Sequence, residues 1–263
     1  MAAVITVDHL QKTYGRVVAV DDLSFSVEDG EIFGILGPNG AGKTTTVECI
    51  QGLRDADGGT IRVLGLDPMT EAAELRQRIG SQLQDAALPG RLRVAESLEL
   101  FAAFARNPVD CDELLSRWRL QEQRNQAFDT LSGGQRQRLF IALAFVNAPE
   151  LVFLDELTQG LDPQARRATW DLIREIRQDG TTVVLVTHFM DEAEHLCDRV
   201  AVVDDGRVIA LDTPQGLIDG LGLRSVVRFT TQETDLGWVE RLDVVESLTR
   251  RGDAVEVRGT GAV

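Results

Sequence analysis

The apolar positions along this chain alternate with polar ones in some segments and form nearly unbroken runs in others, and both patterns predict strands. Residues 4–8 and 23–27 alternate, which predicts an antiparallel hairpin with one buried face. Apolar runs at 31–36, 151–154 and 181–187 predict strands buried on both faces, as in a parallel sheet. These patterns favour an α/β fold, with a mixed or parallel core sheet and an antiparallel β subdomain at the N-terminus.

Helical spacing of apolar residues accounts for most of the segments between these strands. From about residue 94 to residue 146, the apolar residues follow this spacing, which predicts an all-helical insert over about residues 85–147. Its aromatic residues, among them Phe101, Phe104 and Trp118, are expected in the core together with Leu98. The remaining predicted elements are helices at 44–51, 71–79, 136–147 and 191–197, a short strand at 58–64, and a hairpin at 199–210 that turns at Asp-Gly.

The pattern also divides the chain into two domains. We expect a large domain over residues 1–222 and a small C-terminal α+β extension over residues 223–263. In the extension, strand-like stretches at 225–229 and 254–257 flank a helix expected at 236–241. The extension stops early, which indicates either a truncated chain or an incomplete appendage.

Composition narrows the class of protein. The net charge of -15 and the pI of about 4.6 disfavour a protein whose main task is to neutralise nucleic-acid phosphates. The longest unbroken apolar run, 139–146, is far shorter than a membrane span, and the N-terminus lacks a signal pattern. Cys49, Cys111 and Cys197 are widely spaced, which disfavours a disulfide framework or a zinc site. We therefore expect a cytoplasmic protein that acts on membranes only through a partner.

A glycine-rich loop between the run at 31–36 and the helix at 44–51 predicts a phosphate site. Its glycines let backbone N–H groups surround an anion, and the following helix adds partial positive charge. Lys43 would reach the terminal phosphates, and it is one of only two lysines in the chain, the other being Lys12. The loop comprises Gly37, Pro38, Asn39, Gly40, Ala41, Gly42, Lys43, Thr44 and Thr45.

A second glycine-rich turn precedes the helix at 136–147. Ser132, Gly133, Gly134 and Gln135 would direct backbone N–H groups from a second helix N-terminus, which predicts a second anion site. Such a turn is also a common helix cap, and this alternative stays open on the residues alone.

Two buried strands are expected to deliver polar side chains to one edge of the sheet. Asp155 and Glu156 end the run at 151–154, and His188 follows the run at 181–187. One acid can hold Mg²⁺ and the next can polarise an attacking water, while the histidine can contact a phosphate. The alternatives are a solvated acidic loop and a structural histidine. Tyr14, beside Gly15, is predicted either to stack on a nucleotide base or to pack the hairpin.

The order and spacing of these motifs resemble those of an ATP-binding-cassette (ABC) ATPase, a P-loop protein. The resemblance covers roughly residues 4–220 and is closest to the ATP-binding subunits of drug-export ABC transporters of the daunorubicin-resistance type. It rests on Tyr14, the loop at 37–45, Gln84, the turn at 131–135, the strand and acids at 151–156, Gly160 to Asp162, and His188.

The resemblance implies roles for individual residues. Tyr14 would stack on adenine, and the loop at 37–45 would hold the ATP phosphates. Thr44, Gln84 and Asp155 would form the Mg²⁺ site, and Gln84 would also act in catalysis beside Glu156, the general base, and His188, the γ-phosphate contact. Ser132, Gly133, Gly134, Gln135 and Asp162 would bind nucleotide, with Ser132 and Gly134 contacting the ATP of a second copy of the chain in a dimer that sandwiches two nucleotides.

The chain departs from the family pattern at Leu157, where the family usually has proline. A flexible residue next to the base is expected to affect hydrolysis more than ATP binding. We expect an ATPase that powers export of a drug-like or other hydrophobic compound through a separate membrane permease docked near Gln84 and the helical insert. The alternatives are a cytosolic ABC ATPase of the iron-sulfur assembly type, or a regulator that binds nucleotide and no longer hydrolyses it.

Overall fold

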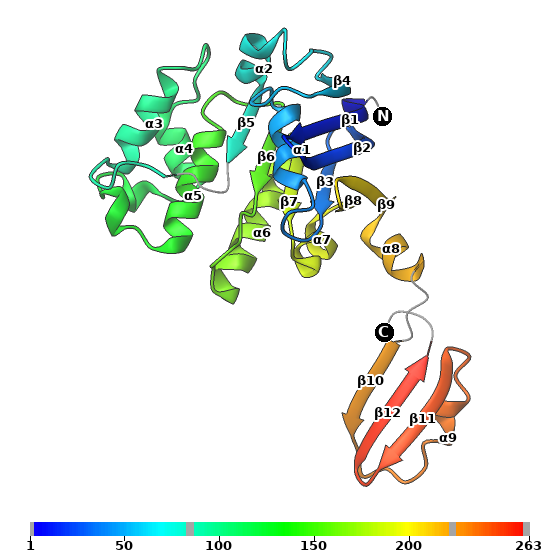
Figure 1. Cartoon of the computed structure of the whole chain (residues 1–263). Helices are drawn as coiled ribbons and strands as arrows, with labels where there is room; N and C mark the ends of the chain where they lie inside the picture. The colour runs from blue at the N-terminus through cyan, green and yellow to red at the C-terminus, as the bar shows by residue number, and fades with distance from the viewer. Residues whose placement is uncertain (1–2, 83–86, 221–224, 260–263) are drawn as a thin grey trace. The chain divides into compact units, whose positions relative to one another are not determined.

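The computed structural model describes residues 3–82, 87–220 and 225–259, and its contacts divide the chain into two compact units, residues 1–213 and 214–263 (Figure 1). The sequence placed this boundary at 222/223, and the domain limits stay a prediction.

The strands of the first unit are β1 (Ala3–Tyr14), β2 (Val17–Glu28), β3 (Ile32–Leu36), β4 (Gly58–Val63), β5 (Ile79–Gln82), β6 (Leu151–Asp155), β7 (Thr182–Thr187), β8 (Arg199–Asp204) and β9 (Arg207–Asp212). Its helices are α1 (Lys43–Ile50), α2 (Ala72–Arg78), α3 (Val94–Ala102), α4 (Cys111–Arg117), α5 (Gly133–Ala144), α6 (Pro163–Gln178) and α7 (Met190–Leu196).

The core sheet has the strand order β5-β6-β7-β3-β8-β9. The first five strands are parallel and β9 is antiparallel to β8, so the sheet is mixed. Every residue of β3, β6 and β7 is buried, as their continuous apolar sequences predict. Because these three strands are parallel neighbours, their carboxyl ends meet at one edge of the sheet, where ligands bind in open α/β sheets.

An antiparallel sheet of order β2-β1-β4 covers the first helix from the other side. One hydrophobic cluster joins the two sheets through α1, with Val47 and Ile50 of the helix packed among residues of both. Phe25 of β2 stacks on Phe33 of β3, with ring centroids 5.2 Å apart. The N-terminal sheet therefore holds α1 against the core sheet, and with it the loop that precedes the helix (Figure 1).

The predicted helical insert is confirmed in the described residues 87–147, where α3, α4, α5 and two short 3-10 helices (Gln121–Gln123, Phe128–Thr130) follow one another. Leu98, Leu114, Leu115 and Trp118 are buried in it. Phe101 and Phe104 are exposed instead, at 41% and 76%. Helical spacing placed these two rings in the core, and that expectation is wrong.

One strand of the core sheet was missed. The sequence predicted a helix through Ile79, but α2 ends at Arg78 and β5 begins at Ile79. β5 pairs in parallel with β6, from Ile79 opposite Leu151 to Gln82 opposite Leu154. A Gly-Ser-Gln sequence has little intrinsic strand preference, so this strand depends on the pairing partner that the fold supplies.

The second unit contains α8 (Pro214–Gly220), β10 (Ser225–Thr230), α9 (Gly237–Glu240), β11 (Val245–Arg251) and β12 (Ala254–Gly259). Its strands form an antiparallel sheet of order β10-β12-β11. Leu236, Val239, Val255 and Val257 form a small core between α9 and the sheet. The predicted α+β character is confirmed, and the sequence had not singled out β11.

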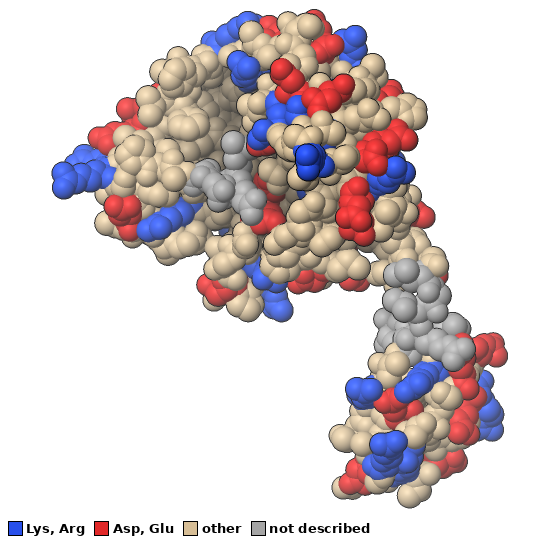
Figure 2. Space-filling model, viewed as in Figure 1, with Lys and Arg blue, Asp and Glu red and all other residues tan. Residues whose placement is uncertain are grey.

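The surface is acidic overall, but acidic and basic side chains lie among one another on the face of the first unit shown in Figure 2. No helix in the described part of the chain is long and apolar enough to cross a membrane.

Candidate active site

The glycine loop links β3 to α1, as predicted, and its glycines are required by close approaches. A Cβ on Gly37 would collide with the carbonyl oxygen of Val203, and a Cβ on Gly42 would collide with that of Ala19. Gly40 and Gly42 also have positive φ angles of 86° and 96°, which side chains rarely adopt. The loop therefore follows a path that only glycine permits, directly ahead of a helix N-terminus.

Lys43 is the first residue of α1 and is only 5% exposed. Its Nζ donates hydrogen bonds to the carbonyl oxygens of Gly37, at 2.8 Å, and Pro38, at 2.9 Å. Burial lowers the pKa of the Lys43 ammonium, and the nearby carboxylates of Glu156 and Asp155 oppose this effect. The loop thus holds a partly desolvated positive charge in place.

Asp155 ends β6 with its side chain buried beside α1. Its Oδ2 accepts a hydrogen bond of 3.3 Å from the Thr44 hydroxyl, while its Oδ1 is buried and has no partner among the described residues. Burial, and then the negative charge of Glu156, raise the pKa of Asp155 to about 6, against the opposing effects of Thr44 and Lys43. A hydroxyl next to a carboxylate with an unused oxygen is a donor set that fits Mg²⁺.

Glu156 follows directly and has an unusual backbone. Its φ is 48°, in the left-handed region, although it is not a glycine. The Glu156 N–H donates to the carbonyl oxygen of Val186 at 2.9 Å, and its Oε1 lies 3.1 Å from His188 Nδ1. The strained backbone turns the carboxylate toward the end of β7, as functional residues often do.

Lys43, Thr44 and Glu156 line one cavity of about 340 Å³, together with Ala19, Asn39, Gly40, Gly42 and Thr45. The cavity brings together the glycine loop and the acid that the sequence placed at the same sheet edge. Ala19 of β2 was missed, because an alanine in an alternating strand carries no chemical signal. Gln84, predicted for the metal site and for catalysis, lies outside the described residues.

The second glycine turn caps α5. The Ser132 hydroxyl accepts from the Gln135 N–H at 3.3 Å, and Gln135 Oε1 accepts from the Ser132 N–H at 2.8 Å. The cap that the sequence left as an alternative is therefore present. Yet a Cβ on Gly133 or Gly134 would meet only ordinary contacts, at 3.8 Å and 3.6 Å. The chain's own packing does not require these glycines, and their backbone stays accessible from outside.

Ser132 to Gln135 line a different cavity, of about 630 Å³, together with Arg119, Arg138 and Asp162. Asp162 is the N-cap of α6, and its Oδ1 accepts from the N–H groups of Gln164 and Ala165, both at 2.9 Å. No described residue lines both this cavity and the one at Lys43. Within one chain the two predicted parts of the nucleotide site are therefore separate.

Comparison with known proteins agrees with this geometry. The family model described as ABC transporter matches residues 20–159. The chain is 41% identical over 220 residues to the Nod factor export ATP-binding protein I of Ralstonia nicotianae, covering 82% of this chain and 68% of that protein. It is 44% identical over 218 residues to the daunorubicin resistance ATP-binding protein DrrA3 of Streptomyces coeruleorubidus, with coverages of 81% and 69%.

Among solved structures, one similar to this chain is a dimeric ATP-binding cassette in a post-hydrolysis state, bound to ADP and phosphate. It has a TM-score of 0.70 and 28% identity, and the match covers 80% of this chain and 98% of that one. The chain belongs to the ABC transporter family. It is an ABC transporter ATPase, and ATP is its nucleotide.

In this ABC ATPase, the resemblance drawn from the motifs and the predicted fold class are both confirmed. Lys43, Thr44, Asp155, Glu156 and His188 are brought to one place by β3, β6 and β7. The roles of the individual residues stay predictions. The sequence did not reveal the backbone strain at Glu156, because no local glycine or asparagine signals it.

Tyr14 lies at the end of β1 and is 40% exposed. Lys12 Nζ and Arg54 Cζ lie 5.6 Å and 5.3 Å from the centre of its ring. The Tyr14 ring thus has both an accessible surface and cationic neighbours, which suits it to a base next to phosphates.

Replacing Tyr14 with alanine should weaken ATP and GTP binding alike, by about 1–3 kcal/mol, because every base has a face on which a ring can stack. Fluorescence titration of both nucleotides measures this loss. Tyr14→Phe is the matched control, since it keeps the ring and should bind nearly as the parent does. Parental affinity in Tyr14→Ala would mean that the ring only packs the hairpin.

Proposed function

We propose that this ABC ATPase binds and hydrolyses ATP to power the export of a drug-like or other hydrophobic compound through a separate membrane permease. The observation that carries the proposal is the convergence of Lys43, Asp155, Glu156 and His188 at one sheet edge. The export assignment is supported by the relatives at 41–44% identity, whose names describe Nod factor export and daunorubicin resistance.

In this proposal the glycine loop and Lys43 bind the phosphates of ATP, and Tyr14 stacks on the adenine. Thr44 and Asp155 hold Mg²⁺, with Gln84 added by the family resemblance. Mg²⁺ would neutralise phosphate charge as the terminal phosphoryl group is transferred. The unpartnered Asp155 Oδ1 supports this assignment. No group of three or more His, Cys, Asp or Glu side chains gathers as a metal site in the described chain, so water and phosphate oxygens would complete the shell.

Glu156 is the proposed general base. Its carboxylate would orient a water molecule for attack on the γ-phosphate and accept a proton from it. His188, 3.1 Å from Glu156, would hold this carboxylate in place and contact the γ-phosphate. Leu157 replaces the usual proline, but its side chain is only 1% exposed, so packing restrains the loop beside the base. This observation favours hydrolysis over the nucleotide-binding regulator.

Two copies of the chain would complete each ATP site. Ser132, Gly133, Gly134 and Gln135 line a cavity apart from Lys43, and the two glycines have room that the chain's own packing leaves open. Their N–H groups at the start of α5 suit the γ-phosphate of an ATP held by the other copy, with Asp162 beside them. The dimeric cassette bound to ADP and phosphate supports this arrangement.

A groove between α2, β5 and the helical insert is the proposed contact with the permease. It is lined by Leu53, Phe101 and Phe104, which are 53%, 41% and 76% exposed, and Figure 2 shows a hollow bordered mostly by uncharged side chains. Exposed aromatic rings that border a groove are typical of a protein interface. A cytoplasmic helix of the permease would occupy it.

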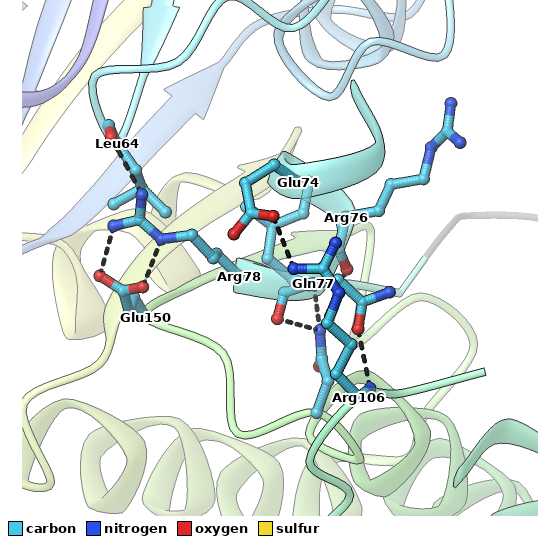
Figure 3. Close-up of polar contacts among 9 residues, drawn as sticks. Leu64, Glu74, Arg76, Gln77, Arg78, Arg106 and Glu150 are labelled. Carbon is cyan, nitrogen blue, oxygen red and sulfur yellow. Dashed lines mark hydrogen bonds and ion pairs between the residues drawn. The ribbon is translucent and has the colours of Figure 1, made fainter. Parts of the chain in front are cut away.

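Polar contacts fix one wall of this groove (Figure 3). Arg106 bonds to Glu74 at 2.6 Å, and Gln77 of α2 accepts from the Arg106 N–H at 2.9 Å and donates to the Phe104 carbonyl oxygen at 3.3 Å. The loop that carries Phe104 is thereby tied to α2.

Through the permease, the protein would lie at the cytoplasmic face of the membrane. We propose no role for it in nucleic-acid binding.

Export is tested in cells that express this chain together with a candidate permease. We expect lower accumulation of a hydrophobic fluorescent dye, and no such effect when Glu156→Gln replaces the parent.

ATP hydrolysis is tested on the purified chain, which should release phosphate from ATP, and EDTA should stop the release. ATP turnover that no co-expressed membrane protein changes would contradict export and favour the iron-sulfur assembly type.

Replacing Phe104 with aspartate should reduce co-purification of the permease at least tenfold, because it places a charge in an apolar contact worth more than 1.4 kcal/mol. ATP turnover by the isolated chain should not change. The matched control is Ile209→Asp, since Ile209 of β9 is 63% exposed and does not line the groove. Equal loss in both variants would exclude the groove as the contact.

A further inference from the structure

Glu192 of α7 is a fully buried carboxylate that the roles proposed above do not use. It is 0% exposed, and its Oε1 accepts two hydrogen bonds, from the Thr158 hydroxyl at 2.9 Å and the Trp170 indole N–H at 3.2 Å. Its Oε2 is buried with no partner among the described residues. A buried carboxylate held by two neutral donors on one oxygen opposes folding, so its presence calls for an explanation.

The three hydrogen-bonding side chains come from three segments of the site. Thr158 belongs to the loop that follows β6, Trp170 to α6, and Glu192 to α7. Thr158 is two residues after Glu156, and Glu192 is four residues after His188. The segment of the base and the segment of the histidine are therefore linked twice, by His188 and Glu156 at 3.1 Å and by Thr158 and Glu192 at 2.9 Å.

The loop that carries the base needs such a restraint. Glu156 has a φ of 48°, a conformation that persists only where the surroundings impose it. Leu157 has no ring to fix its own backbone, so side-chain contacts must hold this turn. Within the described residues, Thr158, which is 1% exposed, makes the one side-chain hydrogen bond between residues 157–159 and α7.

We propose that Glu192 is a positioning residue for ATP hydrolysis, which fixes Glu156 through Thr158. It does not touch the nucleotide. The inference rests on the proposed function, in which Glu156 orients the attacking water. A displacement of the base by about 1 Å can lower the rate on the order of a hundredfold while leaving substrate binding intact.

Thr158→Val and Trp170→Phe form a matched pair, because each removes one donor to the same oxygen of Glu192. Only Thr158→Val loosens the loop of the base. We expect kcat for ATP to fall by about 10- to 100-fold in Thr158→Val with KM nearly unchanged, and to stay near the parental value in Trp170→Phe. Equal losses of kcat in the two variants, or full turnover in Thr158→Val, would overturn the inference.

Glu192 itself separates positioning from folding. Glu192→Met removes the buried charge but leaves the Thr158 hydroxyl and the Trp170 N–H without their acceptor, so its effects on stability oppose each other. The thermal unfolding temperature identifies the folded variant, in which kcat should fall as in Thr158→Val. Glu192→Gln keeps an oxygen that accepts both hydrogen bonds and should restore most of the turnover. Parental kcat in a folded Glu192→Met would contradict the proposal. Glu156→Gln is measured in parallel. If Glu156→Gln still turns over ATP, the assignment of Glu156 as the base is refuted. If Glu156→Gln is inactive while Glu192→Met is active, only the role of Glu192 is refuted.

Discussion

Glu156→Gln should bind ATP as the parent does and lose turnover by about 10²–10⁴-fold. The amide keeps the shape of the side chain and its position 3.1 Å from His188, but it can no longer accept a proton from water. Phosphate release measures turnover, and fluorescence titration measures binding. Turnover within a few-fold of the parent would show that another group activates the water.

The same substitution should expose the ATP-dependent dimer. With hydrolysis blocked, each γ-phosphate can bridge Lys43 of one copy to Ser132 and Gly134 of the other, which stabilises the closed pair by mass action. Size-exclusion chromatography with light scattering should give a dimer of Glu156→Gln with ATP, and a monomer with ADP or without nucleotide. Because each chain carries a charge of -15, moderate salt should strengthen the dimer.

A monomer in all three conditions, despite confirmed ATP binding, would contradict completion of the site by a second copy. Ser132→Ala in the Glu156→Gln background is the matched control. It removes the hydroxyl beside the γ-phosphate of the other copy without touching the cavity at Lys43, so it should weaken the dimer and leave ATP binding to the single chain intact.

Lys43→Met should abolish tight ATP binding. At an effective dielectric constant of about 20, a unit charge about 4 Å from the phosphates contributes roughly 4 kcal/mol. Its loss corresponds to an increase in Kd on the order of a thousandfold. The methionine keeps most of the apolar stem, and nucleotide titration by fluorescence measures the effect.

The folding control for this variant follows from the pKa of Lys43. Burial lowers this pKa, which means that folding disfavours the charged ammonium of Lys43 relative to the unfolded chain. Lys43→Met should therefore keep or slightly raise the temperature of unfolding. Unchanged ATP affinity in a folded Lys43→Met would refute the phosphate-site assignment.

Local sequence was sufficient for the elements that build the site. The apolar runs of β3, β6 and β7 predicted buried parallel strands, and parallel strands place their carboxyl ends together, so Lys43, Asp155 and His188 could be assigned to one edge. The hairpin of β8 and β9 was equally clear from the sequence, because Asp-Gly favours a tight turn. In the structure Asp205 and Gly206 both have the positive φ angles that such a turn requires.

Where the partner of a segment decides its conformation, the sequence was insufficient. β5 is a strand because β6 lies beside it, and Phe101 and Phe104 are exposed although their spacing matches a core face. Periodicity tells which residues share a face of a helix, but whether that face is covered depends on what the rest of the chain places against it.

By itself, then, the sequence determined the nucleotide chemistry, because glycine, lysine and paired acids at fixed spacing act through local backbone geometry. Only the tertiary structure decided how Glu156, the proposed base, is held. The φ of 48° at Glu156, the burial of Leu157, and the bond from Thr158 to Glu192 join residues from separate segments. Such contacts depend on how β6, α6 and α7 pack, and packing is a property of the whole fold rather than of any one stretch of the chain.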